Sequence, residues 1–503
     1  MTKRPNILLI TSDQHHWNAV GYNNNEVKTP NIDRLAKEGT AFNRAYCPNP
    51  TCTPTRASII SGRYPSQHGA YSLGTKLPES EHCVGDDFNA SGYRTALIGK
   101  AHFQQLLSTE KYPSLESNPF MQDLEFWKKF NGPFYGFEHV ELARNHADEY
   151  HVGQHYALWM EEKGFKSWRD CFWPPAGNTP PQKHKWNMPE EFHYDRWIAE
   201  RTNSFLEKYK NNGDNFFLWA SFLDPHPPYL VPEPWDTMYN PEKISIPEHF
   251  PGEHDKNPIH FRMTQETNPD FTVYAEKGGN GCHGFKSHIH DKKSLAKDIA
   301  VYYGMISLMD KYIGTILDKL DSLGLTENTL VVFTTDHGHF YGHHGLIAKG
   351  PFHYEDMIKI PFVARMPGTV PSGKKSEALQ SLVDLAPTFL AFSEIDIPAE
   401  MTGVNQKNAW TGEKDKIRDS LIVENRHQPT TINARTYVDE RYKITVYYKR
   451  DYGEIFDLLE DPGELNNLWD APEYSGLKSE LLLKFIHAEM GKEPLPMPRV
   501  CVA

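Results

Sequence analysis

Cys52 is the residue whose type and neighbours first indicate covalent chemistry in this chain. It stands before Thr53 and Pro54, which suit the N-cap and the first turn of a helix, so the thiol is predicted at a helix N-terminus. Free backbone N–H groups and the helix dipole stabilise an anion there, and Arg56 would add a fixed charge. A lone cysteine is often only a small buried apolar residue. With Pro54 and Arg56 at these spacings, the sequence favours a reactive thiol.

Two aspartates predict a metal site. Asp13 and Asp336 each follow a short apolar run, a position that turn and capping residues also occupy. Each stands beside another polar side chain, Gln14 and His337 respectively. Paired carboxylates with such neighbours suit a hard divalent cation bound through oxygen.

Four apolar runs must position these residues, and each is predicted to be a strand buried on both faces of a parallel sheet. A polar cluster follows each run directly. In open α/β sheets ligands bind beyond the carboxyl ends of the strands, so these clusters are expected to converge. The runs are residues 7–10 before Asp13, 95–98 before Lys100 and His102, 216–222 before His226, and 330–335 before Asp336 and His337.

Helical signals lie between the runs. Thr29, Pro30 and Gly39 suit the N-cap, the first turn and the C′ position of a helix. Between residues 299 and 320 apolar side chains recur every three or four positions, which predicts a long amphipathic helix packed on the sheet. The predicted fold class is therefore α/β, with a large, mostly parallel sheet sandwiched by helices.

Three stretches break this alternation. Residues 104–190 and 230–293 are rich in aromatic residues, proline and histidine, and are predicted to be insertions over one end of the sheet, where long loops often bind ligands. Residues 411–503 predict a smaller C-terminal α+β domain with an antiparallel sheet, after a catalytic domain of residues 1–410. The insertions hold tryptophans that can stack on sugars or fill cores: Trp127, Trp159, Trp168, Trp173, Trp186 and Trp235.

The composition excludes several classes of protein. The 503 residues carry a formal net charge of −13, which argues against a general nucleic-acid binder. No apolar run approaches the roughly 20 residues that span a bilayer. Residues 1–10 show no secretory signal, so a cytoplasmic location is expected. The six cysteines form no CxxC pair, which makes a disulfide framework or a thiolate zinc site improbable.

The stretch from Cys52 to Gly62, C-T-P-T-R-A-S-I-I-S-G, resembles the signature of the formylglycine-dependent (type I) sulfatases of the alkaline-phosphatase-like superfamily. The resemblance extends through the strand ends above and covers most of the chain. It implies that a formylglycine-generating enzyme oxidises Cys52 to formylglycine. It also implies a divalent cation, Ca²⁺ or alternatively Mn²⁺ or Mg²⁺, held by Asp13, Gln14, the modified Cys52, Asp336 and His337. Gln14 replaces a second aspartate of many members, and His337 replaces an asparagine.

The same resemblance assigns catalytic roles. Lys100 and His102 match a Gly-Lys-x-His segment, and His226 and Lys349 match a second histidine and a second lysine. Hydrated formylglycine offers a hydroxyl that attacks sulfur, with Arg56 and the metal lowering its pKa. The lysines stabilise sulfate oxygens, His226 protonates the leaving oxygen, and His102 takes the proton whose loss expels sulfate.

These observations predict a sulfatase that acts on a small sulfated saccharide. The enzymatic alternatives are a phosphonate monoester or phosphodiester hydrolase, because similar enzymes carry glutamine at the position of Gln14, and a choline sulfatase. The alternative from another class is a binding protein for sulfated ligands with an unmodified Cys52. Neither a membrane nor a nucleic acid is expected as a partner.

Further histidines invite a zinc site, but only His337 is assigned to metal. Those that follow it are interpreted as lid or substrate contacts, namely His339, His343 and His344. Solvated loop residues are expected at His283, His288 and His290.

Overall fold

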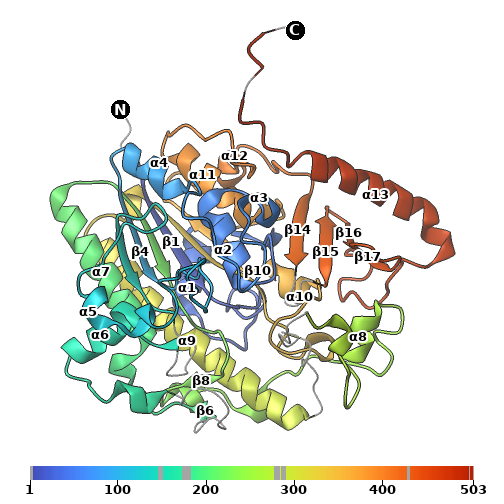
Figure 1. Cartoon of the computed structure of the whole chain (residues 1–503), viewed down its shortest axis with the longest axis horizontal. Coiled ribbons are helices and arrows are strands. Elements are labelled where there is room, and N and C mark those ends of the chain that lie inside the picture. The colour runs from blue at the N-terminus through green and yellow to red at the C-terminus, as the bar shows by residue number, and fades with distance from the viewer. Residues whose placement is uncertain are drawn as a thin grey trace.

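The structure is a computed structural model and describes residues 4–144, 151–172, 183–276, 284, 291–426, 431–497 and 499–501. In this part of the chain a central sheet lies between helices, and a small antiparallel sheet lies beside it (Figure 1). The helices are α1 (Pro30–Glu38), α2 (Cys52–Ser61), α3 (Pro65–His68), α4 (Val84–Ala90), α5 (Leu124–Trp127), α6 (Gln154–Glu162), α7 (Tyr194–Asn212), α8 (Ile259–Met263), α9 (Lys292–Ser322), α10 (Glu355–Ile358), α11 (Leu385–Phe392), α12 (Lys407–Trp410) and α13 (Ser475–Met490).

Within the described residues the largest sheet has eight strands, and its central strands are parallel. Across the sheet they follow the order β12 (Lys374–Ser376), β2 (Thr40–Phe42), β11 (Val363–Arg365), β9 (Thr329–Thr335), β1 (Asn6–Ser12), β7 (Phe216–Ser221), β4 (Arg94–Gly99) and β5 (His139–Leu142). From β9 to β5 all neighbours pair in parallel, whereas β11 is antiparallel to both of its neighbours. The predicted mostly parallel sheet is confirmed. The four predicted strands are β1, β4, β7 and β9.

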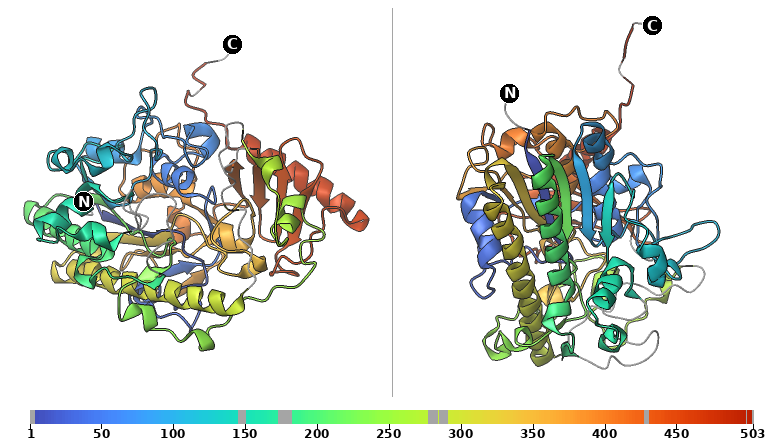
Figure 2. Two further views of the ribbon diagram at one scale, coloured as in Figure 1. Left: turned by 60° about the horizontal axis from the view of Figure 1, so that its bottom comes forward. Right: turned by 90° about the vertical axis from the view of Figure 1, so that its left-hand side faces the viewer.

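Side chains of each central strand point alternately to the two faces of the sheet, and helices pack on both faces. Leu8 of β1 packs in one core with Ile313 of α9, and Leu9 packs in the other core with Ile60 of α2. The long helices α7 and α9 lie side by side along one face, as the right-hand view of Figure 2 shows. Helix α9 confirms the amphipathic helix predicted between residues 299 and 320.

The glycine that ends α1 serves a purpose different from the predicted one. Helix α1 follows Thr29 as expected, but Gly39 is extended, with φ −137°, instead of left-handed. A Cβ atom at Gly39 would lie 2.2 Å from the carbonyl oxygen of Ala364 in β11. The glycine therefore permits a close approach of two backbones, which sequence spacing alone did not distinguish from a C′ residue.

The tryptophans of the two insertions belong to the interior. Trp127 and Trp168 are fully buried, and Trp159 and Trp186 are nearly so. Trp235 packs close to α9, with Lys311 over its ring. Trp173 lies outside the described residues. The described tryptophans therefore fill cores.

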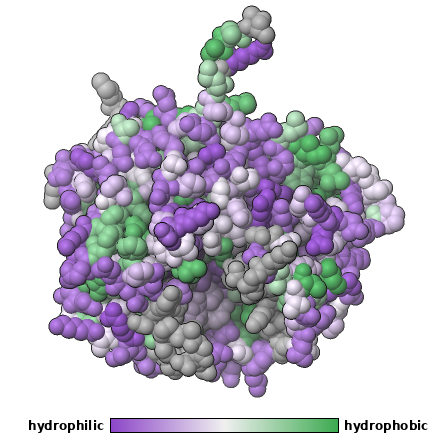
Figure 3. Space-filling model, viewed as in Figure 1, coloured by the Kyte–Doolittle hydropathy of each residue, from purple (hydrophilic) through white to green (hydrophobic). Residues whose placement is uncertain are grey.

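A four-stranded antiparallel sheet follows, in the order β14 (Leu421–Arg426), β15 (Asn433–Val438), β16 (Tyr442–Tyr447) and β17 (Gly453–Asp457). Helix α13 covers it through Leu481 and Phe485, which confirms the predicted antiparallel sheet. Leu483 and Ile486 of the same helix are exposed, and Figure 3 shows a hydrophobic patch over α13. A domain boundary at residue 410 stays a prediction.

Smaller sheets complete the fold. One joins β10 (Lys359–Ile360), β3 (Ala45–Tyr46) and β13 (Gln380–Ser381), and another pairs β6 (His184–Lys185) with β8 (Leu230–Val231). Among the described helices, none combines the length and apolar content that crossing a bilayer requires.

Candidate active site

Helix α2 places Cys52 in its first turn, but the helix begins earlier than predicted. Thr51 takes the N-cap position with an extended backbone, so the N-cap predicted at Thr53 is wrong. The earlier start follows from Asn49, whose side-chain oxygen accepts hydrogen bonds from the N–H (2.9 Å) and the hydroxyl (2.6 Å) of Thr51. This turn presents Cys52 at the carboxyl end of the sheet.

The Cys52 thiol is buried among charged groups. Its Sγ lies 3.2 Å from Nζ of Lys349 and 3.2 Å from Nε2 of His337. Burial and the carboxylate of Asp13 act to raise the pKa of the thiol, but Lys349 and Lys100 outweigh them, and the net pKa is lowered. The surroundings of position 52 thus favour an anion.

Arg56, one helical turn after Cys52, holds the two strand-end carboxylates. Its Nε lies 2.9 Å from Asp336 Oδ2 and its Nη2 lies 3.2 Å from Asp13 Oδ2, with all three side chains buried. Nη1 donates to Ser221 Oγ (2.8 Å) and to the Lys100 carbonyl (2.9 Å). Burial would raise the pKa of Asp13, but Lys100 and Arg56 hold it well below its ordinary value. The positive charge of Arg56 and the negative charges of the two aspartates therefore compensate one another in the interior.

The donor set around these carboxylates fits a divalent cation. Asp13, Cys52, Asp336 and His337 offer ligand atoms that all lie within 4.8 Å of one another. The side chain of Gln14 is buried and lines the same cleft, and neither of its amide atoms has a hydrogen-bond partner among the described residues. A cation bound there would give the amide oxygen a partner, and oxygen ligands suit Ca²⁺.

Lys100 and His102 enter the site through a sharp turn after β4. Gly99 has φ +109°, and a Cβ atom there would lie 1.9 Å from the Ser221 carbonyl oxygen, so only glycine fits. Nζ of Lys100 then reaches Asp13 Oδ2 at 2.5 Å. Glu116 fixes the turn by accepting a 2.6 Å hydrogen bond from the backbone N–H of His102.

His226 and Lys349 meet in the wall of the cleft, which His102 also lines. Nε2 of His226 lies 3.2 Å from Nζ of Lys349, and its Nδ1 donates to the carbonyl of Pro227 at 2.6 Å. Burial, together with the charges of Lys349 and Lys100, places the pKa of His226 well below its ordinary value. The imidazole is therefore neutral before an anion binds.

These residues open into a cleft of about 1070 Å³. Gln14, Cys52, His102, His226 and Lys349 form part of its wall, with the Arg56–carboxylate network buried next to them. The first predicted insertion supplies much of the remaining wall, including Tyr112, and Tyr71 comes from the chain before it. Further lining residues are Lys76, Gln105, Leu106, Leu107, Arg144 and His151. The predicted insertion thus borders the site with tyrosine and histidine instead of tryptophan.

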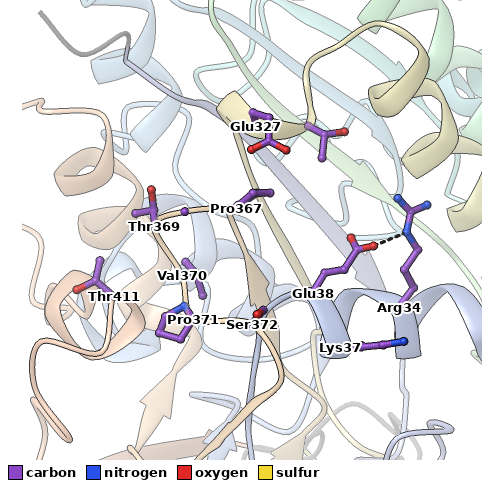
Figure 4. Close-up of a pocket in the computed structure, with 12 residues that line it drawn as sticks. Arg34, Lys37, Glu38, Glu327, Pro367, Thr369, Val370, Pro371, Ser372 and Thr411 are labelled. Carbon is purple, nitrogen blue, oxygen red and sulfur yellow. Dashed lines mark hydrogen bonds and ion pairs between the residues drawn. The ribbon is translucent and has the colours of Figure 1, made fainter.

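A second cavity lies at the amino end of the sheet. It lies between α1 and the turn after β11, and Figure 4 shows the ion pair of Arg34 with Glu38 on one side and the Pro367–Pro371 turn on the other. The Nε–Oε1 distance of that pair is 2.9 Å. Its lining holds no cysteine and no histidine. The chemistry therefore belongs to the cleft at the carboxyl end.

The histidines that follow His337 do not line the cleft. His339 is buried and its Nε2 lies 2.8 Å from the Tyr229 hydroxyl. His344 lies between Glu253 (2.7 Å) and Asp356 (3.3 Å), and His343 lies beside Asp356. Their interpretation as lid or substrate contacts is wrong, because His339 and His344 are buried against other side chains and the partly exposed His343 pairs with Asp356 outside the cleft lining. His283, His288 and His290 lie outside the described residues.

Sequence reasoning missed three polar residues of the site. Ser221 ends β7 and joins Arg56 to Lys100, a role that its strand-end position signals. Glu116 and Arg144 come from the first insertion and form a buried ion pair beside His102, with 3.3 Å between Arg144 Nη1 and Glu116 Oε1. No local pattern marks them, because the contact depends on how the insertion folds.

Comparison with known proteins agrees with this geometry. A family model described as "Sulfatase" matches residues 5–395, and a model described as "N-sulphoglucosamine sulphohydrolase, C-terminal" matches residues 342–490. An arylsulfatase of Clostridium perfringens (strain 13 / Type A) is 29% identical over 94% of this chain and 91% of its own length. An N-acetylglucosamine-6-O-sulfatase of Bacteroides thetaiotaomicron is 25% identical over 96% of this chain and 85% of its own length.

A solved structure extends the likeness to the fold. The phosphonate monoester hydrolase SpPMH from Silicibacter pomeroyi superposes with a TM-score of 0.79, at 23% identity, over 98% of this chain and 96% of its own. At that identity the likeness concerns the fold alone. The family model covers far more than half of the chain and includes Cys52, the strand ends and the cleft. The chain therefore belongs to the sulfatase family and is a sulfatase.

Proposed function

We propose that this enzyme hydrolyses a sulfate ester on a sulfated saccharide, with a formylglycine derived from Cys52 as nucleophile. A formylglycine-generating enzyme would mature the chain. A divalent cation, Ca²⁺ in the first instance, would be held by Asp13, Gln14, Asp336, His337 and residue 52. The observation that carries the proposal is the Cys52 thiol, which lies 3.2 Å from both Lys349 and His337 at the wall of a large cleft.

The chain's own residues support each part of sulfate transfer. Hydrated formylglycine at position 52 would supply a hydroxyl nucleophile, and the cation would supply charge for sulfate oxygens. Lys100 and Lys349 both direct ammonium groups toward residue 52, and these groups would stabilise charge on a sulfate bound there. The network of Arg56 with Asp13 and Asp336 keeps these groups oriented without reorganisation.

Proton transfer is assigned to His226 and His102 of the cleft. A bound sulfate would offset the charges of Lys349 and Lys100 that now depress the pKa of His226. The substrate itself would thereby help to protonate this imidazole, which then donates to the leaving oxygen. His102, whose backbone N–H is held by Glu116, would accept the proton whose removal releases sulfate.

A saccharide suits the cleft better than a long polyanion. The volume of about 1070 Å³ accommodates a small sugar, and Tyr71 and Tyr112 offer aromatic faces among polar groups. One relative is an N-acetylglucosamine-6-O-sulfatase. The net charge of −13 disfavours attraction of long anionic chains, so recognition depends on local cations.

Kinetics on a substrate panel tests the proposal. Sulfated mono- and disaccharides are compared with an aryl sulfate, choline sulfate, a phosphonate monoester and a phosphodiester, after mass spectrometry of the Cys52 peptide, which formylglycine makes lighter. We expect the highest kcat/KM for a saccharide. A best saccharide 100-fold slower than choline sulfate or the phosphodiester, about 2.7 kcal/mol of transition-state binding, would contradict the saccharide assignment.

Phosphonate monoester or phosphodiester hydrolysis is the second candidate. Gln14 beside Asp13 and the fold likeness to a phosphonate monoester hydrolase favour it. The same panel separates the two reactions, because a phosphonate hydrolase would release alcohol from the phosphonate faster than sulfate from any ester.

A further inference from the structure

We propose that Arg144 binds a second anionic group of the substrate, a carboxylate or a further sulfate, next to the sulfate that is removed. The proposal rests on the function proposed above and concerns the same cleft. Arg144 lies two residues after the end of β5, its side chain is 0% exposed, and it lines the cleft together with Cys52.

The guanidinium of Arg144 is incompletely paired. Its Nη1 donates to the Gln104 carbonyl at 3.1 Å and to Glu116 Oε1 at 3.3 Å. Nε and Nη2 are buried, and neither has a hydrogen-bond partner among the described residues. A guanidinium carries five N–H donors, and leaving several of them buried without an acceptor is costly. A ligand that supplies the missing acceptors accounts for the arrangement.

Glu116 balances the charge of Arg144 but leaves most of its N–H donors unpaired, because the carboxylate already accepts other hydrogen bonds. It accepts hydrogen bonds from the backbone N–H groups of His102, Phe103 and Gln104, at 2.6, 2.8 and 2.8 Å. Its contact with Arg144 is the longest of the four. Glu116 thus orients the arginine and the turn after β4 together, and the forked face of the guanidinium remains for a bidentate anion.

The position of Arg144 separates it from the sulfate that reacts. Asp13 and Asp336 follow β1 and β9, whereas Arg144 follows β5, and β7 and β4 lie between β1 and β5. Three strand spacings place the backbone of Arg144 about 14 Å from β1. Lys100 after β4 lies nearer the nucleophile and reaches Asp13 itself. In the proposal the guanidinium, whose charge interacts with those of Cys52 and Arg56, contacts a substrate group next to the reacting sulfate.

Another cation of the wall shows what a paired side chain looks like. Lys76 also lines the cleft, but its Nζ lies 2.8 Å from Glu79 and 2.7 Å from the Pro113 carbonyl. Its charge is already compensated by the protein. Arg144, with less compensation and complete burial, is the better receptor for an anion.

Binding of matched sugars tests the proposal without turnover. Titration calorimetry uses the full chain with Cys52→Ser, in the presence of Ca²⁺, with and without Arg144→Gln. One pair of ligands is glucosamine 6-O-sulfate and glucosamine 2-N,6-O-disulfate. The other pair is a 2-O-sulfated hexuronate and its methyl ester. For at least one of these pairs, we expect the member with the second anionic group to bind at least about 10-fold more tightly than the other member. Arg144→Gln should reduce this preference to below about 3-fold.

The controls separate binding from folding. Arg144→Lys keeps a charge next to Glu116 and should retain part of the preference, and Arg94→Gln on the surface should retain all of it. Equal affinities within both pairs, or a preference that Arg144→Gln leaves intact, would overturn the proposal. Equal weakening of all four sugars would also overturn it, because Arg144 would then serve the common sulfate or the fold. Failure of the proposed function is read separately, as absence of sulfate release by the mature wild-type enzyme.

Discussion

Two largely buried clusters of charged side chains meet the segment that follows β1, one at Asp13 and the other at His16. The catalytic cluster comprises Asp13, Cys52, Arg56, Lys100, Asp336, His337 and Lys349. The histidine cluster comprises His16, Glu253, His343, His344 and Asp356. Both bring carboxylate and imidazole groups close enough to hold a cation, yet their hydrogen bonding differs.

In the histidine cluster the protein satisfies its own polar groups. Nδ1 of His16 accepts a hydrogen bond from the backbone N–H of Asn18 (3.0 Å), so its Nε2 carries the proton that is donated to Asp356 (2.8 Å). A nitrogen that donates a proton has no lone pair for a metal. Next to the catalytic cluster, by contrast, the Gln14 amide lines the cleft and lacks a protein partner among the described residues. Unsatisfied groups beside a cleft mark the functional cluster, and mutual satisfaction marks the structural one.

The largest expected effect comes from Cys52→Ala. Removing the precursor of the nucleophile should lower kcat by at least about 10⁴-fold, because the remaining charged groups only bind and orient the ester. The fold should persist, since the change removes a single buried sulfur from α2. Sulfate release and thermal unfolding of the purified variant measure both effects. Near-normal turnover would contradict the nucleophile assignment.

Much of this cluster was predictable because strand ends are marked in the sequence. Short apolar runs identified β1, β4, β7 and β9, and the parallel arrangement brings Asp13, Lys100, His226 and Asp336 to one edge. Arg144 and Glu116 were not predictable in this way, because they meet through the folding of an insertion. The histidines after His337 misled for a similar reason: their partners, Glu253 and Asp356, lie elsewhere in the chain.

A matched pair of isosteric substitutions, Asp336→Asn and Asp356→Asn, should sharpen the comparison between the clusters. Asp336→Asn removes a carboxylate from the donor set and from Arg56, so Ca²⁺ affinity should fall at least about 10-fold, with a larger loss of activity. Asp356→Asn should lower stability and leave Ca²⁺ affinity within about 3-fold, because its partners are histidines of the other cluster. Calorimetry with Ca²⁺ and urea unfolding distinguish the outcomes. Full activity of the wild-type enzyme after exhaustive chelation would refute the metal assignment.

The smallest expected effect is a pH-dependent loss of stability in His344→Gln. Despite burial, Asp356 and Glu253 raise the pKa of His344 to about 9. The folded state therefore favours the protonated imidazole, and this stabilisation is complete below the ordinary value of about 6.5 and lost as the pH rises through 9. The neighbouring imidazoles of His343 and His254 have pKa values of about 4, lowered by burial, so they stay neutral across this window.

Urea unfolding at pH 6 and at pH 10 measures the effect. The difference in free energy of unfolding between wild type and His344→Gln should be about 2–3 kcal/mol larger at pH 6 than at pH 10. Glu253, whose pKa is lowered to about 2 even though burial opposes the shift, remains charged at both values, so the change reports the imidazole. A difference that is the same at both pH values would show that His344 contributes by packing on Tyr354, with ring centroids 3.6 Å apart, and not by its charge. In that case the ion pairs of His344 would add nothing to the stability of the histidine cluster. The two clusters would then differ only in how completely their hydrogen bonds are satisfied.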